Sequence, residues 1–181
     1  MSGYALGSWP RDQDIFNQGA IIPASIQQGF GAGVKVGLFP SALHGMMGLA
    51  LDSNIHHGTL SFPNATRGSI HGTGRSDLLV SNTTANLILR YPGKYVRPYV
   101  GIGLGWSSGV LLNPNISGRA DEDFDSAYAL VHQFLVGGQF LISPKWFLFG
   151  EYRYVSANYH WDGLAIDFRT HYGLAGAGLR F

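Results

Sequence analysis

The sequence is poor in charge, free of cysteine and without long apolar runs, and each absence excludes a class of protein. Asp, Glu, Lys and Arg make up 13% of its 181 residues, about half the share of a typical globular domain. The formal net charge of +1 gives no electrostatic basis for nucleic-acid binding. Without cysteine there is no disulfide and no thiol catalysis. No run of 18 apolar residues is present, so a transmembrane helix is excluded.

What the sequence has instead is glycine and aromatic residues. It contains 26 Gly, and aromatic residues make up 13% of the chain. This composition fits a β-sheet wall with lipid on one side and packed side chains on the other. The length suits one domain, which we place at residues 1–181. The start lacks the basic segment and apolar run of a signal peptide, so we expect these residues to be the mature form of an exported protein.

Tight turns and long polar connections alternate along the chain. Turn signals occur at Pro40–Gly45, Tyr91–Lys94 and Ser143–Lys145, and polar stretches lie at about residues 10–28, 58–76, 109–126 and 157–166. This is the layout of an up-and-down outer-membrane barrel. The sequence therefore predicts an all-β fold, an eight-stranded antiparallel transmembrane β-barrel. Its strands are expected near 2–10, 28–39, 46–57, 77–91, 95–108, 127–142, 146–157 and 166–181, with room to extend into the long connections.

Within these strands the residues alternate in character. Apolar residues take every second position from Phe30 to Leu38 and from Val100 to Trp106, with glycine or Lys35 at most positions between. A soluble β-sandwich would also alternate, but with shorter strands and with Lys, Thr or Glu in place of mid-strand glycine. We therefore expect the apolar face to meet lipid. Aromatic girdles are predicted from Trp106, Tyr128 and Tyr154 at the upper interface and from Tyr91, Phe140, Trp146 and Phe181 at the lower one.

The last residues, HYGLAGAGLRF from His171 to Phe181, alternate and end on an aromatic residue. Other short motifs precede them: GSWP at Gly7–Pro10, GFGAGVKVGLFP at Gly29–Pro40, RPYVGIGLG at Arg97–Gly105 and FGEYRYV at Phe149–Val155. In order and spacing these motifs resemble the OmpA-like and Opa-like group of small outer-membrane β-barrels, over nearly the whole chain. The last strand departs from the pattern, because Gly173, Ala175 and Ala177 stand where bulkier residues are commoner.

The resemblance implies a location in the outer membrane of a Gram-negative bacterium, with both termini in the periplasm. It also implies contact with outer-membrane lipids and lipopolysaccharide, and recognition of Phe181 by the barrel-assembly machinery. We expect the chain to end at the barrel, so the peptidoglycan-binding role of full OmpA is not carried over.

Four charged residues at inward-facing positions form the first candidate site. Lys35, Asp52 and Glu151 lie about five residues from the short turns, and Arg153 shares their parity, so we expect the four to meet inside the barrel. Buried charges persist only when they are paired, and an eight-stranded barrel is only wide enough for side chains. We therefore favour a salt-bridge plug over a gate that passes small solutes. Inward-facing polar residues expected to complete the network are Asn82, Thr84, Asn86 and Gln133.

Two further groups of charges fall in the long connections. The acidic run of Asp121, Glu122, Asp123 and Asp125 could hold a divalent cation, but it lacks the spacing and glycine of an EF-hand, so a solvated loop is favoured. Basic residues that could meet lipid A phosphates are Arg67, Arg75 and Arg119. The adjacent pair His56 and His57 would point to opposite faces of a strand, so we predict no metal site.

An enzyme is the least favoured alternative. Small outer-membrane barrels include lipid A deacylases, which carry a His-x-Ser pair on a late strand. Here Ser156 is preceded by Tyr154 in place of that His, and His160 lies four residues later, too far to serve well as its base. We predict a non-enzymatic outer-membrane protein without a cofactor, which supports the envelope and presents loops for adhesion or recognition. A narrow pore or a conduit for small apolar ligands is the alternative.

Overall fold

The computed structural model describes residues 1–11, 13–17, 20–62, 74–112, 124–161 and 164–181. These residues form antiparallel strands and one short 3-10 turn, η1 (Ser41–Leu43). The strands are β1 (Ser2–Pro10), β2 (Gln13–Asn17), β3 (Ala20–Ile26), β4 (Gly29–Leu38), β5 (Met47–Phe62), β6 (Gly74–Arg90), β7 (Val96–Leu112), β8 (Phe124–Leu141), β9 (Trp146–Trp161) and β10 (Leu164–Leu179). In this part of the chain no helix is long and apolar enough to cross a membrane.

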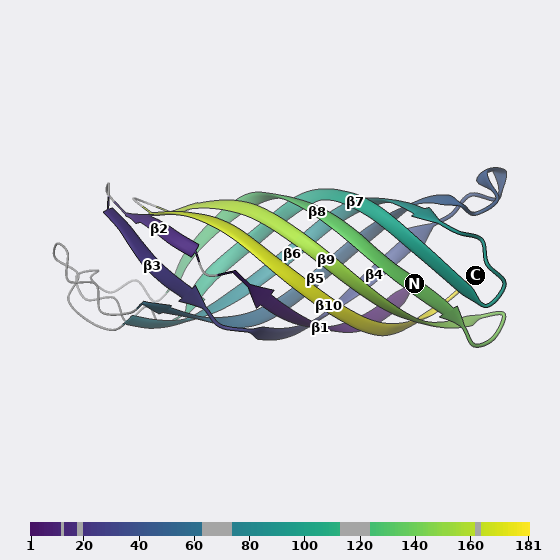
Figure 1. Ribbon diagram of the computed structural model, residues 1–181, viewed down its shortest axis with the longest axis horizontal. Coiled ribbons are helices and arrows are strands. Elements are labelled where there is room, and N and C mark those ends of the chain that lie inside the picture. The colour runs from purple at the N-terminus through teal and green to yellow at the C-terminus, as the bar shows by residue number, and fades with distance from the viewer. Residues whose placement is uncertain (12, 18–19, 63–73, 113–123, 162–163) are drawn as a thin grey trace.

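The strands close into a barrel of eight positions (Figure 1). From β5 to β10 each strand pairs with the next, and β1 pairs with β4 on one side and β10 on the other. Because β10 pairs with both β1 and β2, β2 continues the position of β1; because β5 pairs with both β4 and β3, β3 shares the position of β4. The predicted eight-stranded antiparallel barrel is confirmed.

The strands run further than predicted at one end of the barrel. β5 to β9 each extend several residues into stretches expected to be polar connections, and β8 reaches 18 residues. The stretch at 10–28, expected to be a loop, instead contains β2 and β3, which pair with each other. Within that stretch β3 is mostly apolar in sequence, and the polar residues of β2 are compatible with pairing because backbone N–H and C=O groups pair whatever the side chains. The two termini and the short turns lie together at the opposite end (Figure 1).

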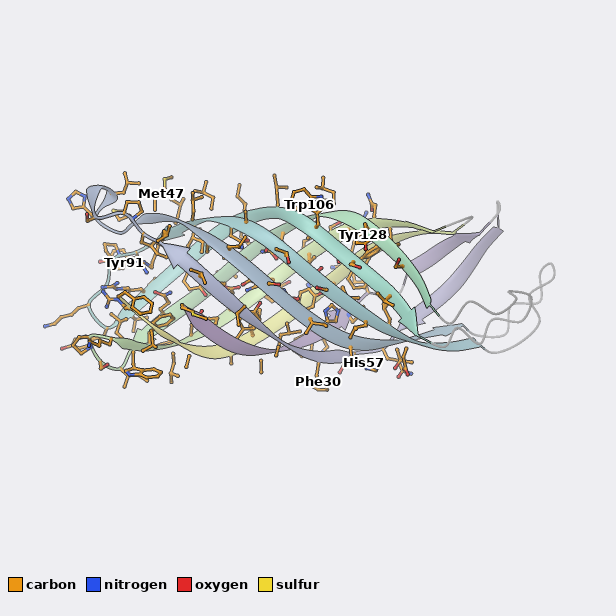
Figure 2. All side chains as sticks on the ribbon, turned by 180° about the vertical axis from the view of Figure 1, so that it is seen from behind. Phe30, Met47, His57, Tyr91, Trp106 and Tyr128 are labelled. Atoms are coloured by element: carbon orange, nitrogen blue, oxygen red, sulfur yellow. The ribbon has the colours of Figure 1, made fainter. Side chains whose placement is uncertain are left out.

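The two faces of the wall follow the predicted alternation. Ile102, Leu104 and Trp106 on β7 are 60%, 64% and 71% exposed, whereas the residues between them are buried. Figure 2 shows Trp106 and Tyr128 projecting outward from the wall. On β10, whose register the sequence left least certain, Ala175 and Ala177 are exposed and their neighbours point inward. The outer surface of the barrel is therefore apolar, as a wall in lipid requires.

The interior is less polar than the sequence pattern indicated. Large apolar side chains pack there beside the glycines and charges, including Leu6, Val131, Leu135, Phe147 and Phe149, all at most 7% exposed. The predicted alternation is correct, but the inward-facing positions hold bulky apolar residues as well as glycine. The interior is therefore filled with side chains, in keeping with the small diameter of an eight-stranded barrel.

Candidate functional site

The barrel interior brings the four predicted charged residues together. Lys35 on β4 lies directly opposite Asp52 on β5. Glu151 and Arg153 are two residues apart on β9, so both point to the same side of the sheet. All four side chains are buried, with at most 9% of each residue exposed. We call these four residues the charge cluster.

Within the charge cluster each carboxylate contacts both cations. The Lys35 Nζ donates to Glu151 Oε2 at 2.5 Å and lies 3.8 Å from Asp52 Oδ2. Arg153 binds Asp52 through two parallel hydrogen bonds, from Nη1 to Oδ1 at 2.9 Å and from Nη2 to Oδ2 at 2.7 Å. The Arg153 Nε also donates to Glu151 Oε1. Two cations and two carboxylates give a formal charge of zero, the condition under which buried charges persist.

Two tyrosines from other strands donate hydrogen bonds to the carboxylates of the charge cluster. Tyr4 on β1 donates to Asp52 Oδ1 at 2.6 Å, and Tyr99 on β7 donates to Glu151 Oε2 at 2.6 Å. The alternation from Val100 to Trp106, continued back by one residue, points Tyr99 inward, but the sequence did not indicate either hydrogen bond. The sequence could have placed Tyr4 in the interior, because Tyr4, Leu6 and Ser8 occupy alternate positions of β1 and all face inward.

Glycines on neighbouring strands make room for these tyrosines. A Cβ atom at Gly33 would lie 2.3 Å from the Tyr4 Oη, and one at Gly137 would lie 2.7 Å from the Tyr99 Oη. A Cβ atom does not approach another heavy atom that closely, so any other residue would displace the ring. The mid-strand glycines are therefore part of the site, because they set where the phenol groups reach the carboxylates.

Amide and hydroxyl side chains extend the polar network along β5, β6 and β8. Asn82 donates to Asn54 Oδ1 at 3.1 Å, and Gln133 donates to Thr84 Oγ1 at 2.9 Å and also to Asn86 Oδ1. These side chains are buried, as the inward parity predicted. Among the buried side-chain nitrogen and oxygen atoms of the described residues, only His56 Nδ1 and Thr170 Oγ1 lack a partner. The charge cluster and its polar neighbours are thus fully hydrogen-bonded.

Other predicted site residues lie largely outside the described residues. This holds for Asp121, Glu122 and Asp123 of the acidic run and for Arg67 and Arg119. Asp125 and Arg75 belong to β8 and β6 by their backbone, and their side chains are not described. The divalent-cation and lipid A hypotheses therefore remain predictions.

The residues considered for hydrolysis do not form a catalytic pair among the described side chains. Ser156 on β9 lies opposite His132 on β8, a neighbour that reading along one strand could not reveal. No hydrogen bond joins the described side chains of Ser156 and His132, although a serine nucleophile needs a base within hydrogen-bond reach. The side chain of His160 is not described.

The predicted girdle residues lie on the outside of the barrel. Trp106 and Tyr128 are 71% and 74% exposed, and Tyr154 packs against His171 on the outer surface with ring centroids 5.4 Å apart. Tyr91, Phe140, Trp146 and Phe181 are all more than half exposed. Figure 2 shows Tyr91 near one end of the barrel and Trp106 and Tyr128 further along the wall.

The comparisons with known proteins agree with this architecture. Neisserial surface protein A (NspA) is 14% identical, with 99% of this chain and 96% of that chain covered and a TM-score of 0.61. Ail, the attachment invasion locus protein of Yersinia pestis, is 15% identical, with 99% of each chain covered and a TM-score of 0.50. A search of curated proteins finds no match. The family model described as outer membrane protein beta-barrel domain matches residues 12–181. The chain belongs to this outer-membrane β-barrel family, whose members lie in the outer membrane of Gram-negative bacteria.

Proposed function

We propose that this protein is a non-enzymatic, closed barrel that supports the outer membrane and presents its long connections for adhesion or recognition. Both termini would then lie in the periplasm, and the polar stretches at 58–76 and 109–126 would lie at the cell surface. Lipopolysaccharide and a surface ligand are the proposed partners of the outer end, and the barrel-assembly machinery that of Phe181.

The observation that carries this proposal is the charge cluster across the interior. Its cations and carboxylates are mutually paired and hydrogen-bonded to Tyr4 and Tyr99. A hydrated ion that passes this level must separate at least one of these pairs in a space with little water, which is costly. The pairing therefore supports a plug rather than a pore.

Conductance in planar lipid bilayers tests the plug. We expect the wild-type protein to show little steady conductance. Glu151→Gln leaves a cation without its partner and should make the barrel less stable or more conductive. A large steady conductance in the wild type that Glu151→Gln does not change would contradict the plug and favour the narrow pore or apolar-ligand conduit.

Adhesion is tested at the surface connections. One structurally similar protein is named an attachment invasion locus protein, and attachment is the interaction to measure first. Replacing residues 63–73 or 113–123 by a short Gly-Ser linker should reduce attachment of expressing bacteria to host cells or matrix proteins. Circular dichroism must show an unchanged barrel in these variants. Attachment equal to that of the unaltered protein in both variants would refute the adhesive role.

A further inference from the structure

A second polar feature lies inside the barrel, at the end that holds both termini. It is a cavity of about 330 Å³, a size at the lower end of small-molecule sites. Met1 and Phe181 line its mouth. Lys35 of the charge cluster and Tyr99, which donates to that cluster, lie at its inner limit. The cavity is therefore a vestibule that ends at the charge cluster. None of the roles proposed above uses it.

Three arginines give the vestibule a concentrated positive charge. Arg90, Arg97 and Arg180 line it, and the charges of Arg97 and Arg180 both act unfavourably on that of Arg90. In the part of the chain that the structure describes, no side-chain carboxylate lies within 4 Å of any of the three. Asp52 and Glu151, the nearby side-chain carboxylates, are already paired in the charge cluster.

The distribution of acidic residues in the sequence reinforces this imbalance. No Asp or Glu occurs at positions 36–51, 78–120, 126–150 or 168–181, which include the three short turns and the last strand from Phe168 onward. Among the basic residues of these stretches, those in or next to the short turns and at the C-terminus are Arg90, Lys94, Arg97, Lys145 and Arg180. The terminal end of the barrel is thus basic without internal compensation by side chains.

Two of the three arginines, Arg90 and Arg97, are held in place by neutral groups, which orient their donors without cancelling their charge. Arg90 donates to the carbonyl oxygen of Gly45 at 3.2 and 3.0 Å and to Gln139 Oε1 at 3.1 Å. Its guanidinium also stacks over Phe39, 3.7 Å from the ring centroid. Arg97 donates from Nε to the carbonyl oxygen of Gly93 at 2.9 Å, which leaves its Nη groups available.

The remaining walls of the vestibule are apolar. They include Phe39, Phe147, Phe149 and Leu179. Guanidinium groups bind phosphate and carboxylate through paired, charge-assisted hydrogen bonds, and aromatic walls bury an apolar body. A ligand that binds both the arginines and the apolar walls must carry an anionic group and an apolar body.

We propose that this vestibule binds an organic anion, a phosphate or carboxylate joined to an apolar body of about the size of an aromatic ring system. The anionic group lies among Arg90, Arg97 and Arg180, and the apolar body lies against Phe39 and Phe147. The ligand enters from the end of the barrel that holds the termini and does not cross the charge cluster.

The probe for this site is 1-naphthyl phosphate, titrated calorimetrically into the full-length barrel in zwitterionic lipid nanodiscs, with empty nanodiscs subtracted. We expect saturable binding that weakens as salt is added. Inorganic phosphate and 1-naphthol, which each carry half of the recognition chemistry, should bind at least about tenfold more weakly. Arg97→Gln and Arg180→Gln should each weaken naphthyl phosphate binding about tenfold or more, the loss expected for a hydrogen bond to a charged group.

Lys145→Gln is the matched control, because Lys145 is an exposed cation at the same end and does not line the vestibule. Its binding constant should equal that of the wild type. Arg180→Gln is the variant least able to disturb the fold, since in the described residues its side chain makes no hydrogen bond. The proposal is overturned by an absence of saturable binding, by equal binding of inorganic phosphate, or by an equal loss in Lys145→Gln and Arg180→Gln.

Discussion

Replacing Glu151 by Gln removes one negative charge from the interior and keeps nearly the same shape. In the folded protein Glu151 accepts hydrogen bonds from Lys35 at 2.5 Å, from Tyr99 at 2.6 Å and from Arg153. The variant leaves two buried cations facing one carboxylate. Breaking a buried ion pair in this way costs about 3–5 kcal/mol of unfolding free energy. Water reaching Lys35 from the vestibule, which that residue lines, should bring the value toward the lower limit.

The measurement is reversible urea unfolding in lipid vesicles, followed by tryptophan fluorescence. Asp77→Asn is the matched control, because it also removes a carboxylate near a basic group. Asp77 lies 3.7 Å from His57, and both side chains are about half exposed. An exposed pair of this kind contributes about 1 kcal/mol at most. A loss in Glu151→Gln no larger than that in Asp77→Asn would refute the argument from buried charge.

A double variant separates charge from packing. Lys35→Met alone leaves a surplus carboxylate, whereas Lys35→Met with Glu151→Gln restores a neutral interior of similar volume. We expect the double variant to be more stable than the sum of the two single losses predicts, by about 1 kcal/mol or more. Strict additivity would mean that the two residues do not act as a pair, despite the distance of 2.5 Å between Lys35 Nζ and Glu151 Oε2.

Three other changes test the faces of the wall in the same unfolding assay. Ile102→Arg places a charge on the lipid face between the girdle residues Phe140 and Trp106, and should cost about 2–4 kcal/mol near the membrane midplane. A neutral effect would invert the assignment of inside and outside. Gly33→Ala should cost about 1–3 kcal/mol, because its Cβ would lie 2.3 Å from the Tyr4 Oη, whereas Gly3→Ala meets no atom within 4 Å and should be tolerated. Tyr99→Phe should cost about 1–3 kcal/mol, since it leaves the cluster carboxylate with one fewer buried donor.

The barrel could be predicted from the sequence because the patterns that specify it lie within single strands and turns. Alternation with period two assigns each residue to the inner or outer face, and short turns fix where strands reverse. This was enough to place Lys35 and Glu151 inside and Leu148 outside, as the burial of each residue confirms. The full length of the strands was harder to predict, because backbone pairing at the far end tolerates polar side chains such as Gln13 and Asp14 of β2.

The meeting of the four charges could be predicted, but most individual hydrogen bonds inside the barrel could not, because they join strands far apart in sequence. Tyr4 and Asp52 are separated by 48 residues, and Arg153 and Asp52 by 101. The alternation along each strand predicts that these side chains point inward. Their partners depend on the shear of the barrel, which sets the height along the barrel axis at which each residue lies. The same limit applies to Ser156 and His132, which become neighbours only through the register of β8 and β9.

The surroundings of the charge cluster explain why full pairing is needed there. On one side lies the vestibule, which Lys35 lines. On the other side, further along the strands from the termini, the interior is filled by packed side chains. They include Val80, Val131 and Val155, each at most 2% exposed, and the mutually hydrogen-bonded Asn54 and Asn82. Water can therefore approach the cluster from one side only. A charge on the dry side, such as Arg153, has no alternative to its protein partners.

This arrangement also limits how the interior could act as a gate. Lys35 could exchange Glu151 for Asp52, because its Nζ lies 2.5 Å from one carboxylate and 3.8 Å from the other. Such an exchange would rearrange the wet side of the charge cluster, but Arg153 and the apolar packing beyond it would still close the interior. An ion would then meet closely packed side chains, whose polar groups, such as those of Asn54 and Asn82, are already hydrogen-bonded to each other. Loss of one carboxylate should therefore change stability more than conductance, and a steady current in Glu151→Gln would require the apolar packing to open as well.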